Sequence, residues 1–240
     1  MTPFSYSSPQ ITMQNTSLAE VMAGSAAVKL LLIADSARDT LLATPPFAAV
    51  ATQIALGQKA PYSLDDSQGL QRVIFMDARP VLDHRLYKQV RSWVGSLAGL
   101  KATHLALHLE GFDDEHRAQL ARVVLACLLA ADVTLPTQKR SEATSPGYQQ
   151  LQLSPPCELD MTRLSAEAEG NGLARHLAVL PASELDAQGY RAFVQQLAQQ
   201  EGWQWQEFDE AALATLGAGA FLAVARGSAN GQAAIVRLSY

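Results

Sequence analysis

Short apolar segments that alternate with helical patterns constrain the fold of this chain more than any other feature. Four segments have the length and composition of buried strands: residues 28–34, 72–77, 103–109 and 148–153. In the third, leucines alternate with His and Ala, so the leucines share one face of an extended segment. Because none of the four is long enough for a useful helix, the segments predict a sheet.

Helical patterns occupy the intervals between these strands. Between Asp83 and Leu100, apolar residues recur three and four positions apart, and a second helix is expected over residues 117–131 with Asp113 or Asp114 as its N-cap. Crossover helices bury an apolar stripe on a sheet. Residues 28–157 are therefore predicted to form a three-layer-like α/β domain with a mixed sheet.

One polar segment precedes this predicted domain and another lies within it. Residues 1–27 begin with a stretch rich in Ser, Thr, Gln and Pro and are expected to form a flexible arm. Residues 136–147 are almost free of apolar side chains and predict an exposed loop.

The remainder, residues 158–240, continues with mixed elements. Helices are expected over residues 161–179, with an interruption at 170–172, and over 186–201. Strands are expected over 203–208 and 233–240, separated by a short helix that Asp209 caps. The inner face of the helix 186–201 is predicted to carry Tyr190, Phe193, Val194 and Leu197.

Charge and composition exclude several classes of function. The net charge is −5 and the longest basic run is the pair Lys139 and Arg140, which argues against binding to nucleic acid or to an anionic membrane. Charged residues interrupt every apolar stretch well before the roughly 18–20 residues that cross a bilayer, and the N-terminus does not resemble a signal peptide. The two cysteines, Cys127 and Cys157, lack metal-binding spacing and suit a reducing cytoplasm.

A set of segments near the end of the chain resembles the leucyl (cytosol) aminopeptidase family. These segments are residues 180–185, 201–203, 208–210, 216–228 and 234–240. Pro181 and Leu185 match the family's loop, whereas Val179 and Ser183 stand where the family usually has asparagines. The resemblance implies that residues 158–240 are the beginning of the catalytic domain, incomplete in this chain, and that the preceding α/β domain is the family's N-terminal domain.

The resemblance also implies an activity for the full-length protein. The family removes N-terminal amino acids from peptides, is cytoplasmic and hexameric, and uses zinc, manganese or magnesium. Its metal ligands and catalytic arginine follow the matched region, and none of them lies before Tyr240. We therefore assign no catalytic, cofactor-binding or metal-binding residue here and expect the 240-residue chain alone to be an inactive structural or assembly region.

Two other functions remain open at this stage. The chain could be a stand-alone, non-catalytic binding or assembly protein derived from the family. Alternatively, an α/β domain could bind a small nucleotide-like ligand at the carboxyl ends of its strands, although no phosphate-loop motif supports this.

Other polar residues have simpler structural explanations than catalysis. His104 and His108 have metal-ligand spacing for a helix, but on a strand we expect them to line a partly solvated sheet face. The acidic run Asp113–Glu115 is explained by helix capping. Cys127, in an apolar run, is expected to be a small buried side chain.

The candidate motifs in the last forty residues are similarly weak. The glycines of 217–219 and 227 form no complete phosphate loop and are expected in tight turns. Ser228 lacks the GxSxG context of a serine hydrolase. Trp203 and Trp205 share one strand face and are expected to pack in a core rather than to stack on a ligand.

Overall fold

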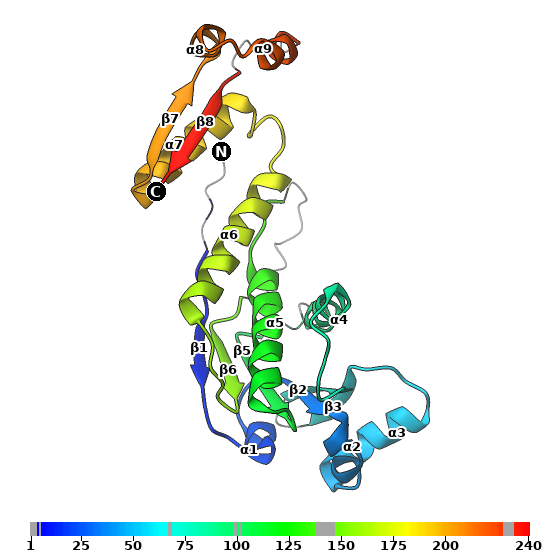
Figure 1. Ribbon diagram of the computed structural model, residues 1–240. Helices are drawn as coiled ribbons and strands as arrows, with labels where there is room; N and C mark the ends of the chain where they lie inside the picture. Colours follow the sequence, from blue (N-terminus) through cyan, green and yellow to red (C-terminus); the bar gives the residue numbers. More distant parts are fainter. Residues whose placement is uncertain are drawn as a thin grey trace. The chain divides into compact units, whose positions relative to one another are not determined.

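The computed structural model describes residue 4 and residues 6–66, 69–97, 100, 102–137, 147–227 and 233–240. The chain divides into two compact units, one of residues 5–175 and one that includes residues 176–240 (Figure 1). The division falls after Arg175, and the predicted domain boundary at residue 157 stays a prediction.

A six-stranded sheet forms the centre of the first unit in the part of the chain that the structure describes. Its order is β1-β6-β5-β2-β4-β3, and β3 is antiparallel to β4 whereas the other neighbours are parallel. The predicted α/β fold with a mixed sheet is thereby confirmed. The strands are β1 (Gln10–Met13), β2 (Val28–Ala34), β3 (Tyr62–Asp66), β4 (Gly69–Met76), β5 (His104–Glu110) and β6 (Gln150–Ser154).

Helices cover both faces of this sheet because the central strand β2 is apolar on both sides. Leu30 and Leu32 pack in one core with α4 (His84–Gly95), α5 (Asp114–Asp132) and α6 (Met161–Val179). Leu31 and Ile33 pack in the other core with α1 (Leu18–Ala23), α2 (Asp35–Leu42), η1 (Pro45–Phe47) and α3 (Ala48–Ala55). All seven residues of β2 are buried, as expected for a parallel strand between two helical layers.

Two helices form as their sequences predict. In α4, the Asp83 carboxylate accepts hydrogen bonds from the backbone N–H groups of Arg85 and Leu86, and the buried side chains recur every four residues along the helix. In α5, Asp113 is the N-cap and accepts a hydrogen bond from the backbone N–H of His116 at 2.9 Å.

The N-terminal segment differs from its prediction as a flexible arm. Residues 10–13 form β1, which pairs with β6, and residues 18–23 form α1. The strand lies at the sheet edge and needs few apolar side chains, so its polar composition concealed it. In α1, Ser17 and Glu20 form a reciprocal capping box.

Further differences concern α6 and the predicted loop. The helix α6 continues through Gly170, Asn171 and Gly172, where we expected an interruption, because single glycines in a helix weaken it without ending it. Most of the predicted loop 136–147 lies outside the described residues, since residues 138–146 are not described.

The second unit contains a two-stranded antiparallel sheet of β7 (Gln204–Phe208) and β8 (Ile235–Ser239). It also contains α7 (Ala187–Glu201), α8 (Glu210–Thr215) and α9 (Gly219–Ala225). Asp186 and Asp209 cap α7 and α8, and Gly202 ends α7 with a left-handed φ of 70°. In α7, Val194 is buried as predicted, but Tyr190 is 50% exposed and Ala198 replaces it on the inner face.

Candidate functional site

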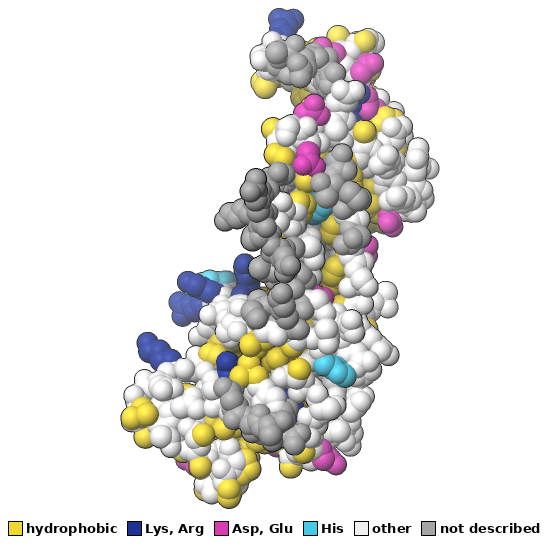
Figure 2. Space-filling model, turned by 180° about the vertical axis from the view of Figure 1, so that it is seen from behind, with side chains coloured by type: hydrophobic (Ala, Val, Ile, Leu, Met, Phe, Trp, Pro, Cys, Tyr) yellow, Lys and Arg dark blue, Asp and Glu magenta, His cyan; other side chains and the backbone are white. Residues whose placement is uncertain are grey.

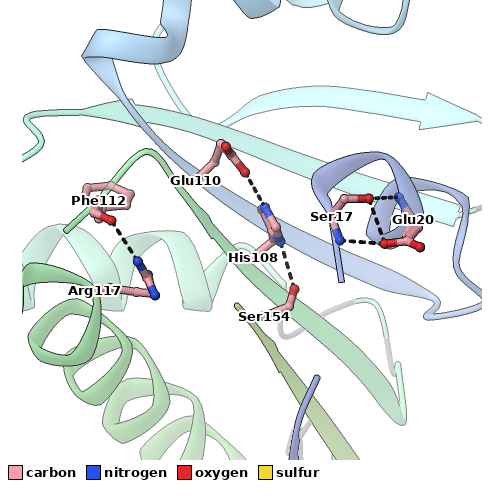
Figure 3. Close-up of polar contacts among 7 residues, drawn as sticks. All are labelled: Ser17, Glu20, His108, Glu110, Phe112, Arg117 and Ser154. Atoms are coloured by element: carbon pink, nitrogen blue, oxygen red, sulfur yellow. Dashed lines mark hydrogen bonds and ion pairs between the residues drawn. The ribbon is translucent and has the colours of Figure 1, made fainter. Parts of the chain in front are cut away.

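Polar side chains meet where the parallel strands β5 and β6 end. His108 and Ser154 are register partners on these neighbouring strands, and His108 Nδ1 lies 2.8 Å from Ser154 Oγ. His108 Nε2 lies 2.9 Å from a carboxylate oxygen of Glu110 (Figure 3). His108 and Ser154 are each 1% exposed, whereas the Glu110 side chain is 39% exposed. The imidazole therefore connects a core hydroxyl to a surface carboxylate.

Burial sets the charge state of this imidazole. Desolvation lowers the pKa of His108 below its usual 6.5, although the hydrogen bond and charge of Glu110 oppose the shift. The ring is therefore neutral at pH 7. With Nε2–H donating to the Glu110 carboxylate, Nδ1 accepts from the Ser154 hydroxyl, so both ring nitrogens are satisfied. We predicted that His104 and His108 line a partly solvated sheet face; this was wrong for His108, which is buried, whereas His104 is half-buried.

A pocket of about 610 Å³ opens beside this group. Its lining includes His108, Glu110, Leu41 and Pro155 together with residues 15–20, which carry the Ser17–Glu20 capping box (Figure 3). After β2 the chain continues into α2 on one sheet face, whereas after β5 it continues into α5 on the other. Such a switch point at the carboxyl ends of parallel strands forms a crevice that is suited to ligands.

The arrangement suits binding better than covalent chemistry. The Ser154 hydroxyl resembles a nucleophile beside a base, but its 1% exposure keeps substrates away from it. Among the described residues, the pocket lining carries the carboxylates of Glu20 and Glu110 and has no Lys or Arg. A phosphate group would meet repulsion there, which disfavours the nucleotide-like ligand considered from the sequence.

The other residues singled out in the sequence have structural roles. Asp113 caps α5, and hydrogen bonds from the His116 backbone and side chain lower the pKa of its carboxyl group. Asp114 pairs with Arg117 at 2.9 Å. Cys127 is buried as predicted, and burial raises the pKa of its thiol.

The predicted features of the last forty residues are only partly described. Gly217 has a φ of 76° and follows α8 in a turn, as expected for a tight turn. Trp203 and Trp205 are half-buried on or beside β7. Ser228 lies outside the described residues.

The described side chains do not provide the ligands of a di-metal centre. A di-metal centre of the kind that hydrolyses peptides needs several clustered carboxylates or histidines. Within the described parts of the chain, no three His, Cys, Asp or Glu side chains come together as a potential metal site. The described residues therefore do not fit such a centre, and we derive no chemical step through a metal. No helix in the same residues is long and apolar enough to cross a membrane.

One protein family matches the last part of the chain in sequence. Residues 172–240 match the model of the cytosol aminopeptidase family, catalytic domain. This match includes the segments on which the sequence resemblance rests. No curated protein matches the chain in sequence.

Solved structures share the fold over almost the whole chain. A mutant of tomato leucine aminopeptidase has a TM-score of 0.76 at 15% identity, covering 97% of this chain and 51% of that one. Leucyl aminopeptidase from Trypanosoma brucei in complex with actinonin has a TM-score of 0.65 at 15% identity, covering 96% and 48%. The bottromycin maturation enzyme BotP in complex with Mn has a TM-score of 0.60 at 19% identity, covering 90% and 45%.

These matches show the fold: the chain has the mixed α/β fold that the solved leucyl aminopeptidases have. Within that class, the resemblance to the M17 aminopeptidase family that the sequence predicts is confirmed, with sequence support over residues 172–240. The chain spans about half the length of the solved structures that it matches.

Proposed function

We propose that this chain is the N-terminal, non-catalytic portion of a leucyl-aminopeptidase-like metallo-exopeptidase that removes N-terminal amino acids from peptides. The observation that carries the proposal is the match of residues 172–240 to the family's catalytic domain. The preceding α/β unit supports it, because the shared fold extends over 97% of this chain in the tomato enzyme.

In this proposal the chain has a structural and assembly role. Peptide hydrolysis by two metals needs a bridging water and a polarised carbonyl, both held by clustered carboxylates. We assign those ligands to a part of the enzyme beyond these 240 residues. Zinc, manganese or magnesium would be the metal, and the manganese bound by BotP supports a divalent ion. A cytoplasmic location and a hexameric assembly are further parts of the proposal.

Hydrolysis of a leucyl-amide reporter tests this proposal. The purified 240-residue chain is assayed with added Mn²⁺ or Zn²⁺ beside a longer chain that continues through the following reading frame, and chelator-treated samples serve as controls. We expect metal-dependent hydrolysis by the longer chain alone. Activity of the 240-residue chain would contradict its non-catalytic role.

A second outcome distinguishes the alternative. If neither chain hydrolyses the reporter at any metal concentration, the result favours a stand-alone binding or assembly protein derived from the family. Size-exclusion chromatography with light scattering on the same samples then shows whether the chain assembles with itself.

A further inference from the structure

The solvent-facing side of α4 carries an uninterrupted set of cations. His84, Arg85, Lys88 and Arg91 are all exposed, and no acidic residue occurs between His84 and Gly95. We call these four side chains the α4 basic surface. Figure 2 shows Lys and Arg side chains, with a histidine, gathered over this region. The surface is unusual because the whole chain has a net charge of −5.

These cations have no ion-pair partners among the described residues. Elsewhere in the same unit, Arg122 and Arg163 share the carboxylate of Glu167, at 2.9 and 2.8 Å. Beside the α4 basic surface, the Asp83 carboxylate accepts from backbone N–H groups at 2.8 and 3.1 Å, since it is the helix cap. The charge of Asp83 also interacts with His84 and Arg85. Lys88 and Arg91, further along the helix, thus have charge available for a partner.

Apolar side chains lie beside these cations. Val81 and Leu82, which immediately precede the helix, are 76% and 43% exposed, and Tyr87 on the helix is 39% exposed. A hollow of about 780 Å³ is lined by His84, Tyr87, Lys88, Arg91 and Ser92. Exposed apolar and aromatic groups beside an arginine favour protein partners, because exposed apolar patches mark interaction sites and aromatic residues and Arg are enriched at interfaces.

We propose that the α4 basic surface binds an acidic peptide segment that also carries apolar side chains. His84, Lys88 and Arg91 follow one another at four and three residues, so they lie along one helix face over about 10 Å. A row of separated cations matches carboxylates spaced along a peptide. A single phosphate would need donors that converge on one point.

Charge complementarity also favours a peptide over nucleic acid. The surface has three permanent cations and one histidine, which can neutralise only a few phosphates of a nucleic-acid backbone. The net negative charge of the rest of the chain also repels a dense polyanion. An acidic peptide carries fewer charges at lower density, and its apolar residues have Val81, Leu82 and Tyr87 to contact.

Fluorescence anisotropy with a labelled peptide of about twelve residues, with Glu and Leu interspersed, tests the proposal. The full chain is compared with the double variant Lys88→Glu/Arg91→Glu. The matched control Lys59→Glu/Arg237→Glu changes the net charge equally at exposed positions outside α4. Circular dichroism and thermal unfolding establish that all three chains fold.

We expect salt-sensitive binding to the unmodified chain and to the control, and at least about a tenfold loss of affinity in the α4 variant. Val81→Ser/Leu82→Ser is expected to weaken binding without changing its salt dependence. The proposal is overturned if the unmodified chain does not bind the peptide, or if the α4 variant and the control lose affinity equally. Tighter binding of an equally charged single-stranded oligonucleotide, competing with the peptide, would assign the surface to nucleic acid instead.

Discussion

Replacement of Ser154 by alanine probes the buried hydrogen-bond group at the carboxyl ends of β5 and β6. The serine hydroxyl is buried and lies 2.8 Å from His108 Nδ1. Ser154→Ala removes one oxygen, so the cavity is small, but the buried imidazole nitrogen loses its partner. An unsatisfied buried polar group costs about 1–3 kcal/mol. In a unit of this size that corresponds to a fall in Tm of about 2–12 °C.

Urea unfolding followed by circular dichroism at pH 7 measures this cost. Ser92→Ala, at an exposed position on α4, is the matched control and is expected to change stability by less than about 0.5 kcal/mol. The cost of Ser154→Ala should also shrink by about 0.5–3 kcal/mol when His108 is already leucine, because the two side chains are coupled. Equal effects of Ser154→Ala and Ser92→Ala, or additive effects with His108→Leu, would refute the reasoning.

Two further predictions concern pH and backbone conformation. Burial lowers the pKa of His108, so below about pH 6.5 the unfolded chain binds a proton at this histidine more readily than the folded chain does. The contribution of neutral His108 to the free energy of unfolding is therefore fully present above that pH. It falls as the pH drops, by at most about 1.4 kcal/mol per pH unit. Urea titrations at several pH values should therefore show a flatter dependence in His108→Gln, and parallel curves would contradict this. Gly111 and Gly202 both have positive φ, but a Cβ at Gly111 would lie 3.1 Å from the Ala34 Cβ, whereas one at Gly202 meets nothing within 4 Å. Both alanine variants incur left-handed backbone strain of about 1–2 kcal/mol. Chemical denaturation should show a larger fall in the free energy of unfolding for Gly111→Ala than for Gly202→Ala. A larger fall for Gly202→Ala would disprove the steric argument.

The parts of the fold that the sequence predicts are those with strong apolar periodicity. The strands β2, β4, β5 and β6 and the helices α4, α5 and α7 lie where their patterns place them. In contrast, no side chain of α2 is fully buried, and only Ala37, Leu41 and Leu42 pack partly buried against the core, which is too short an apolar pattern to recognise in eight residues. The helix α1 did carry a signal, since Ser17 and Glu20 have the spacing of a capping box, but its six residues are too few for periodicity to show.

The candidate site was less predictable than the fold. The alternation in residues 104–110 places His108 on a strand face but does not reveal which residue lies beside it. That residue is Ser154, 46 positions later, and the pairing depends on the register between β5 and β6. Register depends on the hydrophobic patterns of both strands together, so the sequence around His108 alone does not specify it.

The pairing of β1 with β6 affects when this sheet can be completed during synthesis. Gln14 follows β1 and its side chain accepts a hydrogen bond from Gln152 of β6, 138 residues later. At a typical rate of about 5–20 residues per second, roughly 7–28 s separate the synthesis of the two partners. Although β1 is synthesised before the other strands of this sheet, it can pair only after β6 has left the ribosome. Until then β1 must stay unpaired in the growing chain.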